Sequence, residues 1–317
     1  MDGAAAGMGP TEFPRTLVEF DERFHDEATC VAYLRSCRWP NGFACPKCSG
    51  TKSWPVRTRL EECAGCGKQT SITSGTVFHG TRKPLRTWFR ALVLMLTSKQ
   101  GCSALEMERL LGLAHQTAWT WAHKLRLLFD PAASSKLDGV VEIDETYLGG
   151  DDTAAHKGRS LAGKKVCVVA AVEVKGTAMG RARVELVADA TSRSLGDFTE
   201  RNVDLGSTLH TDGAAAYISV AKRGYTHQPE VIGNPKRAAK LFPHVHRIFS
   251  LVRRVLLATH QGAVRPHHLQ RYLDEYVFRF NRRSSKNRFL LVQRALDRAV
   301  LERAFTYAQI ADRAVTL

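Results

Sequence analysis

Two Cys-x-x-Cys pairs constrain the fold of the first part of this chain more than any other feature. The pairs, Cys45-Pro-Lys-Cys48 and Cys63-Ala-Gly-Cys66, are separated by 14 residues. Each pair forms a turn that directs two thiolates at one ion, and two such turns complete a tetrahedral zinc site. Because four sulfur ligands leave no open coordination position, the predicted zinc ion is structural and stabilises the local fold. Two separate redox motifs are the alternative interpretation, which this spacing disfavours.

Short strands are expected between the two pairs, around Trp54 and Val56, so the sequence predicts a zinc ribbon. A ribbon of this size forms little core by itself, and its basic residues favour nucleic acid as a partner. These basic residues are Lys47, Lys52, Arg57, Arg59 and Lys68.

The charge of the whole chain points the same way. The formal net charge is +15 and the isoelectric point is near 9.7, which favours a polyanionic partner such as DNA or RNA through counterion release. At 317 residues the chain exceeds the usual span of a single core, so two or three domains are expected. There is no apolar run of about 18 residues, and Met1–Pro10 lacks a basic-then-apolar signal. We therefore expect a cytoplasmic protein without a membrane partner.

Helical patterns follow the ribbon. Leu85–Thr97 is apolar nearly all round, which predicts a buried helix. Ser103 with Glu106 forms a capping-box pattern that opens a second helix, Gly112 ends it, and a third helix is expected over His115–Leu128. A helix, a short glycine turn and a helix are typical of a helix-turn-helix, although an ordinary helical hairpin fits the pattern equally well. In the first interpretation, the residues that face DNA are Gln116, Thr117, Thr120, Lys124 and Arg126.

The second half of the chain has a strand-rich pattern that ends in helices, which predicts an α/β fold with one central sheet. A polar loop is expected at Gly149–Arg159. The expected strands are Val140–Tyr147, Lys164–Val174, Arg181–Ala188, Thr208–Asp212 and a short one at Glu230–Ile232, and the expected helices are Leu195–Asn202, His244–Leu257, His267–Asn281 and Leu290–Tyr307.

Two aspartates interrupt the apolar strands. Asp144 lies within a β-branched strand, and Asp212 ends another and is followed by glycine. Two unit charges about 4 Å apart repel by about 4 kcal/mol at an effective dielectric near 20, so a close pair would imply a shared divalent metal or a raised pKa. Taken singly, each aspartate also fits a solvent-facing strand end or turn. His246, Ser250 and Arg253 share one face of a later helix, although a lone histidine there is equally an ordinary surface residue.

At these motifs the sequence resembles DDE-type transposases of bacterial insertion sequences, in particular the group with an N-terminal zinc ribbon and an ISXO-type catalytic domain. The resemblance extends from about Glu19 to Arg298. It rests on Val-Glu-Ile-Asp144-Glu-Thr-Tyr-Leu-Gly-Gly, His-Thr-Asp212-Gly, Val-His246 with Thr259-His-Gln-Gly262, and the segment Tyr272–Arg283.

This resemblance implies a ribonuclease-H-like core with a mixed sheet, in which Asp144, Asp212 and His246 hold Mg²⁺ or Mn²⁺. A basic residue seven positions after the third ligand, here Arg253, would bind a phosphate. Most such enzymes carry Glu at the third position, and the imidazole of His246 is a weaker ligand for Mg²⁺ and a better one for Mn²⁺. Glu275 is the alternative third ligand, although its spacing of 63 positions from Asp212 does not match the motif.

The implied activity is metal-dependent DNA cleavage and strand transfer at the ends of an insertion sequence, by a bacterial, nucleoid-associated enzyme. Expected partners are double-stranded DNA, as terminal inverted repeats and target, and further copies of the chain. Two other hypotheses stay open: an inactive transposase-derived regulator that only binds DNA, and a nuclease without strand transfer. The residues predicted to contact DNA are Lys124, Arg126, Arg247, Arg254, Arg282 and Arg283.

The predicted fold class is therefore α/β, a ribonuclease-H-like core preceded by a zinc ribbon and a helix-turn-helix-like region. The predicted order is a disordered tail (1–18), the zinc ribbon (19–80), the helix-turn-helix-like region (81–132), the catalytic core (136–283) and a C-terminal helical tail (284–317).

Overall fold

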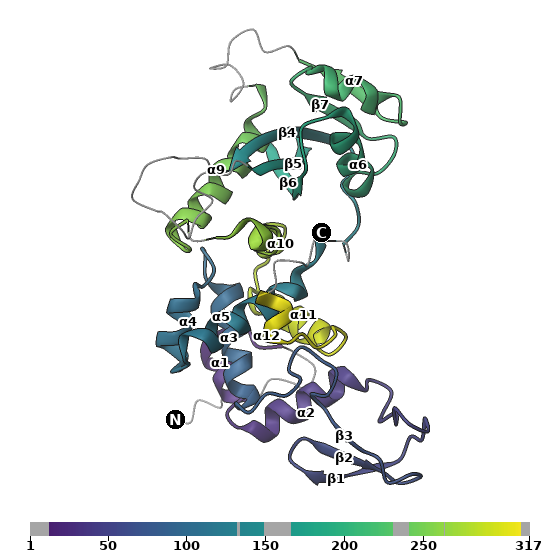
Figure 1. The fold of residues 1–317 in the computed structure, drawn as a ribbon, viewed down its shortest axis with the longest axis vertical. Helices are drawn as coiled ribbons and strands as arrows, with labels where there is room; N and C mark the ends of the chain where they lie inside the picture. Colours follow the sequence, from purple (N-terminus) through teal and green to yellow (C-terminus); the bar gives the residue numbers. More distant parts are fainter. Residues whose placement is uncertain (1–12, 132–133, 149–165, 231–240, 263, 312–317) are drawn as a thin grey trace, which may run out of the picture. The chain divides into compact units, whose positions relative to one another are not determined.

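A computed structural model describes residues 13–131, 134–148, 166–230, 241–262 and 264–311 (Figure 1). Two compact units divide the described chain: the first contains the residues up to Leu128 together with Ser285–Ala311, and the second contains Phe129–Ser284. The predicted loop Gly149–Arg159 and most of the predicted strand Glu230–Ile232 lie outside the described residues. Within the described part of the chain, no helix has the length and apolar character that crossing a membrane requires.

The first unit contains a small antiparallel sheet and a set of helices. Glu61 of this sheet is buried. It accepts a hydrogen bond from Arg35 Nε (2.8 Å), which joins the sheet to the preceding helix, and another from Ser53 Oγ (2.7 Å) of the neighbouring strand. The strands, in the order β1-β2-β3, are β1 (Ser53–Arg57), β2 (Leu60–Cys63) and β3 (Gln69–Ser71). The helices are α1 (Leu17–Arg23), α2 (Glu27–Arg38), α3 (Leu85–Thr97), α4 (Ala104–Leu111), α5 (His115–Arg126), the 3₁₀ turn Leu127–Phe129, α11 (Phe289–Ala299) and α12 (Tyr307–Ala311).

Local sequence signals account for the helix ends in this unit. The side chain of Ser103 accepts a hydrogen bond from the backbone N–H of Glu106 and caps α4, as the capping pattern predicts. Gly112 ends α4 with φ +60°, a left-handed conformation that glycine adopts without steric strain. The prediction of a buried helix over Leu85–Thr97 is confirmed, because eight of its thirteen residues are buried.

Both predicted tails contain ordered residues that pack in the first unit. The predicted disorder over 1–18 is wrong for its last residues, because Phe13 is 3 % exposed and its ring lies 5.7 Å from that of Tyr33. At the other end, α11 buries Leu291 and Leu296 in the unit that contains α2 and α3. The predicted single helix Leu290–Tyr307 is two helices, since the carbonyl of Ala299 accepts a hydrogen bond from the Val77 N–H at the end of α11.

The second unit is built on a five-stranded mixed sheet in the order β6-β5-β4-β7-β8. In this sheet β4 pairs antiparallel with β5 and β5 pairs antiparallel with β6, whereas β7 and β8 run parallel to β4. The strand β8 ends directly before the predicted fifth strand, most of which lies outside the described residues, and α7 was not predicted. The strands are β4 (Val140–Leu148), β5 (Val166–Lys175), β6 (Ala178–Val187), β7 (Thr208–Thr211) and β8 (Thr226–Pro229), and the helices are α6 (Ser192–Asn202), α7 (Ala215–Ala221), α9 (Pro243–Ala258) and α10 (Pro266–Phe280).

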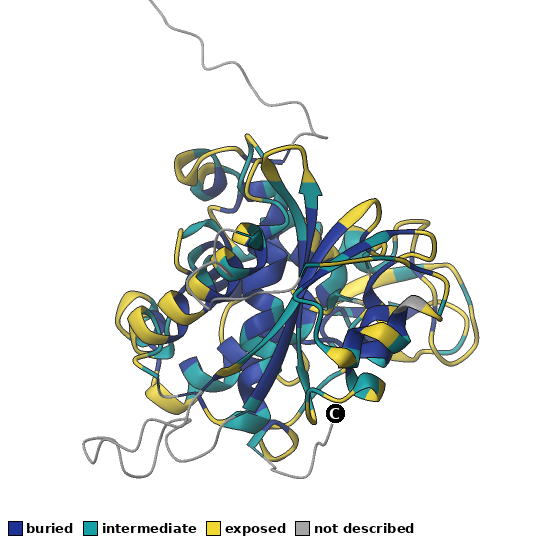
Figure 2. Cartoon of the chain, turned by 90° about the horizontal axis from the view of Figure 1, so that it is seen from above, coloured by how far each residue is buried: buried dark blue, intermediate teal, exposed yellow. Residues whose placement is uncertain are grey.

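Alternate side chains of β4 point to opposite faces of the sheet, and a separate hydrophobic core packs on each face. Val141 and Ile143 pack with residues of α6 and α7, whereas Leu148 packs with residues of α9 and α10. Buried residues accordingly follow the strands and the inward sides of the helices (Figure 2). Three antiparallel strands followed by two parallel ones, with helices on both faces, form the ribonuclease-H-like arrangement that was predicted.

Side chains near α10 cover the free edge of β6. Gln270 accepts a hydrogen bond from the Leu186 N–H and donates one to the Val184 carbonyl. Asn281 does the same for the N–H and the carbonyl of Ala182. Exposed backbone on an edge strand is a template for unwanted pairing, and these amides occupy it.

Candidate active site and zinc site

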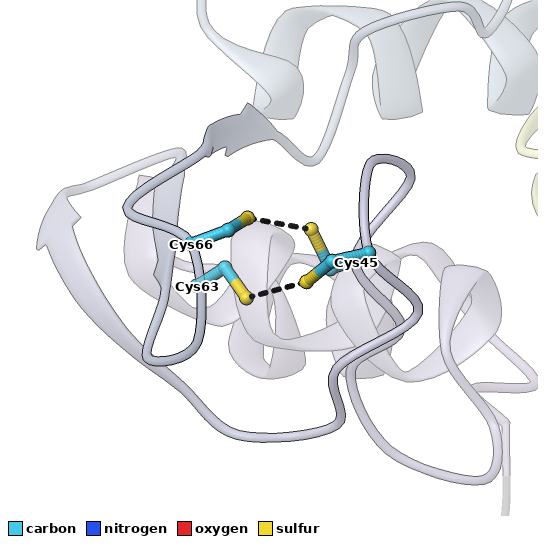
Figure 3. Close-up of side chains that lie close together, drawn as sticks. Cys45, Cys63 and Cys66 are labelled. Carbon is cyan, nitrogen blue, oxygen red and sulfur yellow. Dashed lines mark hydrogen bonds between the residues drawn. The ribbon is translucent and has the colours of Figure 1, made fainter.

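The four cysteines of the ribbon converge on one point. Their sulfur atoms all lie within 4.8 Å of one another, with 3.7 Å between those of Cys45 and Cys66 and 3.5 Å between those of Cys48 and Cys63. Figure 3 shows the sulfur atoms pointing toward one another. Zinc–sulfur bonds of about 2.3 Å in a tetrahedron place sulfur atoms about 3.8 Å apart. The cluster therefore fits one structural zinc ion, as predicted from the spacing.

The backbone around the cluster prepares it for a metal. Lys47 N–H points at the Cys45 sulfur (3.4 Å), and although burial opposes the effect, the N–H groups of Cys48 and Lys47 lower the pKa of Cys45 to about 6. A side chain at Gly50 would place its Cβ 3.3 Å from the sulfur atoms of Cys48 and Cys63, so the turn admits little more than glycine. Lys47, Lys52, Arg57 and Lys68 are exposed, whereas Arg59 pairs with Glu27 at 2.5 Å.

In the second unit, Glu142 of β4 fixes the start of α9. Its side chain is 3 % exposed and accepts hydrogen bonds from the backbone N–H groups of His244 and Val245, each at 2.9 Å. The Nδ1 atom of His244 lies 2.5 Å from the other carboxylate oxygen. Since the residue before α9, Phe242, provides no side-chain cap, Glu142 caps this helix from the neighbouring strand.

Asp144, two residues further along the same face of β4, lies opposite His246 in α9. The distance between His246 Nε2 and Asp144 Oδ2 is 3.6 Å, and this nitrogen is buried without a hydrogen-bond partner among the described residues. Burial, followed by the charge of Glu145, raises the pKa of Asp144 to about 7, and the charges of Asp212 and Glu142 add to the effect. Burial also lowers the pKa of His246, which favours the neutral imidazole that binds metals.

Asp212 follows the end of β7, the strand that pairs in parallel with β4. Glu142 is the register partner of His210, so Asp144 and Asp212 each follow this pair by two positions and lie on the same face of the sheet. That face is turned toward α9, because the ring of His210 lies 5.0 Å from that of Phe242. Asp212 Oδ1 accepts a hydrogen bond from the N–H of Ala214 (3.0 Å).

The three predicted metal ligands do not converge as tightly as the cysteines. Among the described residues, only the four cysteines bring three or more ligand atoms within 4.8 Å of one another. Asp144, Asp212 and His246 instead line one face around the contact between β4 and α9. These three side chains thus share one face without forming a compact set of ligand atoms.

Glu145 connects this site to the opposite face of the sheet. Its carboxylate accepts a hydrogen bond from the buried Tyr217 hydroxyl of α7 (2.7 Å), and burial raises the pKa of Glu145. The roles of Glu142, Glu145 and Tyr217 were missed by sequence reasoning. Their signal was the run of carboxylates around Asp144, together with a tyrosine shortly after Asp212.

The predicted phosphate-binding residue lies further along the same two elements. Arg253 of α9 is exposed, and its guanidinium donates a hydrogen bond to Thr146 Oγ1 of β4 (2.6 Å). Glu142, Asp144 and Thr146 therefore contact successive parts of α9. The alternative ligand, Glu275, is 2 % exposed and lies 3.4 Å from Arg279 on its own helix. This ion pair compensates the charge of Glu275 without a metal.

The residues predicted to contact DNA differ in their surroundings. Arg247 and Arg254 of α9 are exposed, and Lys124 of α5 is half-buried. Arg126 is 2 % exposed, so the structure gives no support to a phosphate contact by its guanidinium. Arg282 donates to the Phe278 carbonyl and covers the Phe278 ring, and Arg283 donates to the carbonyls of Gly180 and Met179. These last two side chains are thus engaged within the second unit.

Comparison with known families matches two parts of the chain. Residues 136–281 match the family described as "ISXO2-like transposase domain", and residues 25–69 match the "Transposase zinc-ribbon domain". The chain belongs to the insertion-sequence transposases. The first match covers β4 to α10 of this transposase, with Asp144, Asp212 and His246, and the second covers all four cysteines.

Two individual proteins are also similar to the transposase over part of its length. One is the "uncharacterized protein in transposable element ISH50" of Halobacterium salinarum, which is 29 % identical over 141 residues, 43 % of this chain and 45 % of the relative. The match thus spans less than half of that relative. The other is the catalytic core domain of BIV integrase, with 16 % identity, a TM-score of 0.29, and coverage of 44 % of this chain and 82 % of that one. The fold assignment rests on the strand order and not on this likeness.

Proposed function

We propose that the transposase catalyses metal-dependent cleavage of DNA and strand transfer at the ends of its insertion sequence. The observation that carries this proposal is the contact between β4 and α9, where the Asp144 carboxylate, with its pKa raised to about 7, faces the unpartnered Nε2 of His246 at 3.6 Å. Asp212 lies on the same face of the neighbouring strand. The family match supports the reaction class, since transposases act on DNA phosphodiesters.

The donor set fits divalent metal ions. Two carboxylates on one face repel each other, and neither a lysine nor an arginine donates a described hydrogen bond to Asp144 or Asp212. A neutral imidazole provides a further lone pair at a distance from Asp144 that a common ion can bridge. Oxygen and nitrogen donors together favour Mn²⁺ over Mg²⁺ relative to an all-carboxylate site. Asp144, Asp212 and His246 would therefore hold the ions.

When bound, such ions would activate water or a DNA 3′-hydroxyl and would neutralise charge on the attacking and leaving oxygens. The chain itself supplies position and charge. Asp144 and Asp212 are fixed by the sheet, and Glu142 holds α9 so that His246 faces Asp144. Arg253, anchored by Thr146, offers its remaining N–H groups to a phosphate of the bound DNA. The reaction needs no covalent intermediate with the protein.

DNA recognition is assigned to the first unit and to the exposed arginines of α9. The four exposed cations of the ribbon and the α4–α5 pair would contact the terminal inverted repeats. Arg247 and Arg254 would add contacts to phosphates beside the catalytic face. Because strand transfer joins two transposon ends to one target, the active form is proposed to be an oligomer assembled on DNA.

A strand-transfer assay with Mn²⁺ tests the activity, using duplexes that carry the terminal repeats of the element. Asp144→Asn and Asp212→Asn are expected to abolish nicking and joining while they retain binding to the ends. Asp204→Asn removes an exposed carboxylate from the same unit and should leave the products unchanged.

The outcomes separate three functions. Products joined to target DNA support the transposase and exclude a simple nuclease. End binding without nicking by the unmodified chain, in Mn²⁺ and in Mg²⁺, would instead support a DNA-binding regulator in which His246 marks a lost catalytic function. Loss of end binding in Asp144→Asn would contradict the separation of binding from chemistry.

A further inference from the structure

A cavity separate from the candidate catalytic face lies in the first unit, beside α5. Its volume is about 410 Å³, which is within the range of small-molecule and cofactor sites. Four segments form its wall: the linker between the ribbon and α3, the first turn of α3, the helix α5, and the start of α12. The lining residues are His79, Gly80, Thr81, Arg82, Lys83, Trp88, Gln116, Thr117, Thr120, Trp121, Lys124 and Tyr307.

The wall of this cavity is fixed by internal contacts. Trp88 Nε1 donates a hydrogen bond to Thr81 Oγ1 (2.9 Å), and the N–H of Lys83 donates to the same oxygen (3.2 Å), so the linker is held over the first turn of α3. The rings of Trp88 and Trp121 stack with their centroids 3.6 Å apart. Tyr307, by contrast, is 47 % exposed, so its ring remains accessible.

The cavity is cationic and lacks internal compensation. None of its lining residues is acidic, whereas Arg82, Lys83 and Lys124 are basic. Within the described residues, no hydrogen bond or ion pair is found for the charged groups of these three side chains. Burial lowers the pKa of Lys124, so an anion bound beside it would stabilise the charged form. A phosphate-containing ligand therefore fits the charge of the site.

A phosphate alone does not account for the rest of the lining. The accessible Tyr307 ring can stack on a nucleobase, and the amide of Gln116 has the donor and acceptor needed for a base edge. Gln116, Thr120 and Lys124 recur every fourth residue and so share one face of α5. A base inside a duplex is stacked between its neighbours and cannot enter such a cavity, whereas an unpaired one can.

We propose that this cavity binds one unpaired nucleotide of a DNA strand, with its phosphate at Arg82, Lys83 and Lys124 and its base at Gln116 and Tyr307. The inference rests on the proposed function in that DNA is the substrate. It assigns the face of α5 with Gln116, Thr120 and Lys124, which a helix-turn-helix would turn to duplex DNA, to an unpaired strand, and so adds a preference for unpaired DNA. Cleavage at a transposon end or opening of a target site would supply such a nucleotide.

Binding assays on the full chain with its zinc, in buffer without Mg²⁺ or Mn²⁺, test this preference. Fluorescence anisotropy compares three labelled DNAs of arbitrary sequence: a blunt duplex, the same duplex with a short single-stranded 3′ extension, and the same extension made abasic. We expect the natural extension to increase affinity about 10-fold over the blunt duplex, as expected for base stacking on an aromatic ring. The abasic extension should recover only a small part of that gain.

Variants identify the cavity as the source of the gain. Tyr307→Ala should reduce the affinity for the extended DNA more than that for the blunt DNA, and Tyr307→Phe, which keeps the ring, should retain the preference. Lys124→Gln should also reduce the gain. The matched control Arg193→Ala removes an exposed cation from α6 of the second unit and should leave the preference unchanged.

Three results would overturn the inference: equal affinities for blunt and extended DNA, equal affinities for abasic and natural extensions, or a preference that persists in both Tyr307→Ala and Lys124→Gln. Because the assay requires no cleavage, its outcome is independent of the strand-transfer test. A chain that prefers the extension but cuts no DNA would contradict the proposed activity and leave this site standing.

Discussion

Glu142 offers the sharpest test of how the second unit positions its candidate metal ligands. Replacing it with alanine removes one carboxylate that accepts hydrogen bonds from the N–H groups of His244 and Val245 and lies 2.5 Å from the His244 ring. Net contributions of hydrogen bonds to charged groups are about 1.5–3 kcal/mol each, and loss of a helix cap costs about 1 kcal/mol. Since these terms overlap, we expect Glu142→Ala to lower the free energy of unfolding by about 3–5 kcal/mol.

Glu142→Gln keeps one acceptor oxygen but turns an amide NH₂ toward donors, so a smaller loss of about 1–2 kcal/mol is expected. Urea unfolding measures both losses, and hydrogen exchange locates them, because the first amides of α9 should lose protection before the strands do. Both variants should also bind Mn²⁺ less tightly, since His246 belongs to the released turn. Glu22→Ala, which removes an exposed carboxylate from α1, is the control, with a change below about 0.5 kcal/mol. A Glu142→Ala protein that matches this control, with α9 still protected, would refute the reasoning.

Three further predictions concern charge and metal. Burial raises the pKa of Asp274 to about 7 in the folded chain, above its unfolded value near 3.9, so folded protein binds this proton more tightly and its stability falls as pH rises between these values. Asp274→Asn should therefore stabilise the chain at pH 8, by up to about 4 kcal/mol, and have little effect near pH 4, as urea unfolding at both pH values can check. Cys45→Ser should lower the zinc content measured by elemental analysis and weaken end binding, with Mn²⁺ binding to the second unit preserved; zinc retained at full stoichiometry would contradict the four-cysteine site. His246→Glu should increase Mg²⁺-supported relative to Mn²⁺-supported strand transfer, and an unchanged ratio would argue against metal binding at this position.

Sequence patterns located most elements because each pattern had one dominant physical cause. The zinc site followed from cysteine spacing alone, and α3 followed from an apolar surface all round. Errors arose where contacts distant in sequence decide the structure. Nothing local shows that the Ala299 carbonyl accepts a bond from Val77, or that Phe13 belongs to an aromatic cluster. Each of these features depends on a partner far along the chain.

The candidate DNA-contacting residues illustrate the same limit. By charge alone, Arg247, Arg254 and Arg283 were equally good candidates, and all three are exposed. Within the described part of the chain, a hydrogen bond or ion pair of the guanidinium group is found only for Arg283. Arg283 instead donates to backbone carbonyls at the start of β6. A count of basic residues predicts the class of partner through counterion release, and it does not identify the side chains that make contact.

Glu142 and Glu145 lie on either side of Asp144 in β4, and their contacts suggest why a histidine can occupy the proposed third metal-ligand position. Glu142 fixes α9 on one face of the sheet, and Glu145 holds Tyr217 of α7 on the other. The helix that carries His246 is therefore placed by a buried carboxylate cap and not by attraction between the ligand and the metal. Because α9 is held in this way, the side chain of His246 lies near Asp144 whether or not it carries a charge. In the proposed metal site, exchange between Glu and His at position 246 would change the preferred ion while α9 keeps its position, so the choice of metal would be separate from the fold that places the ligand.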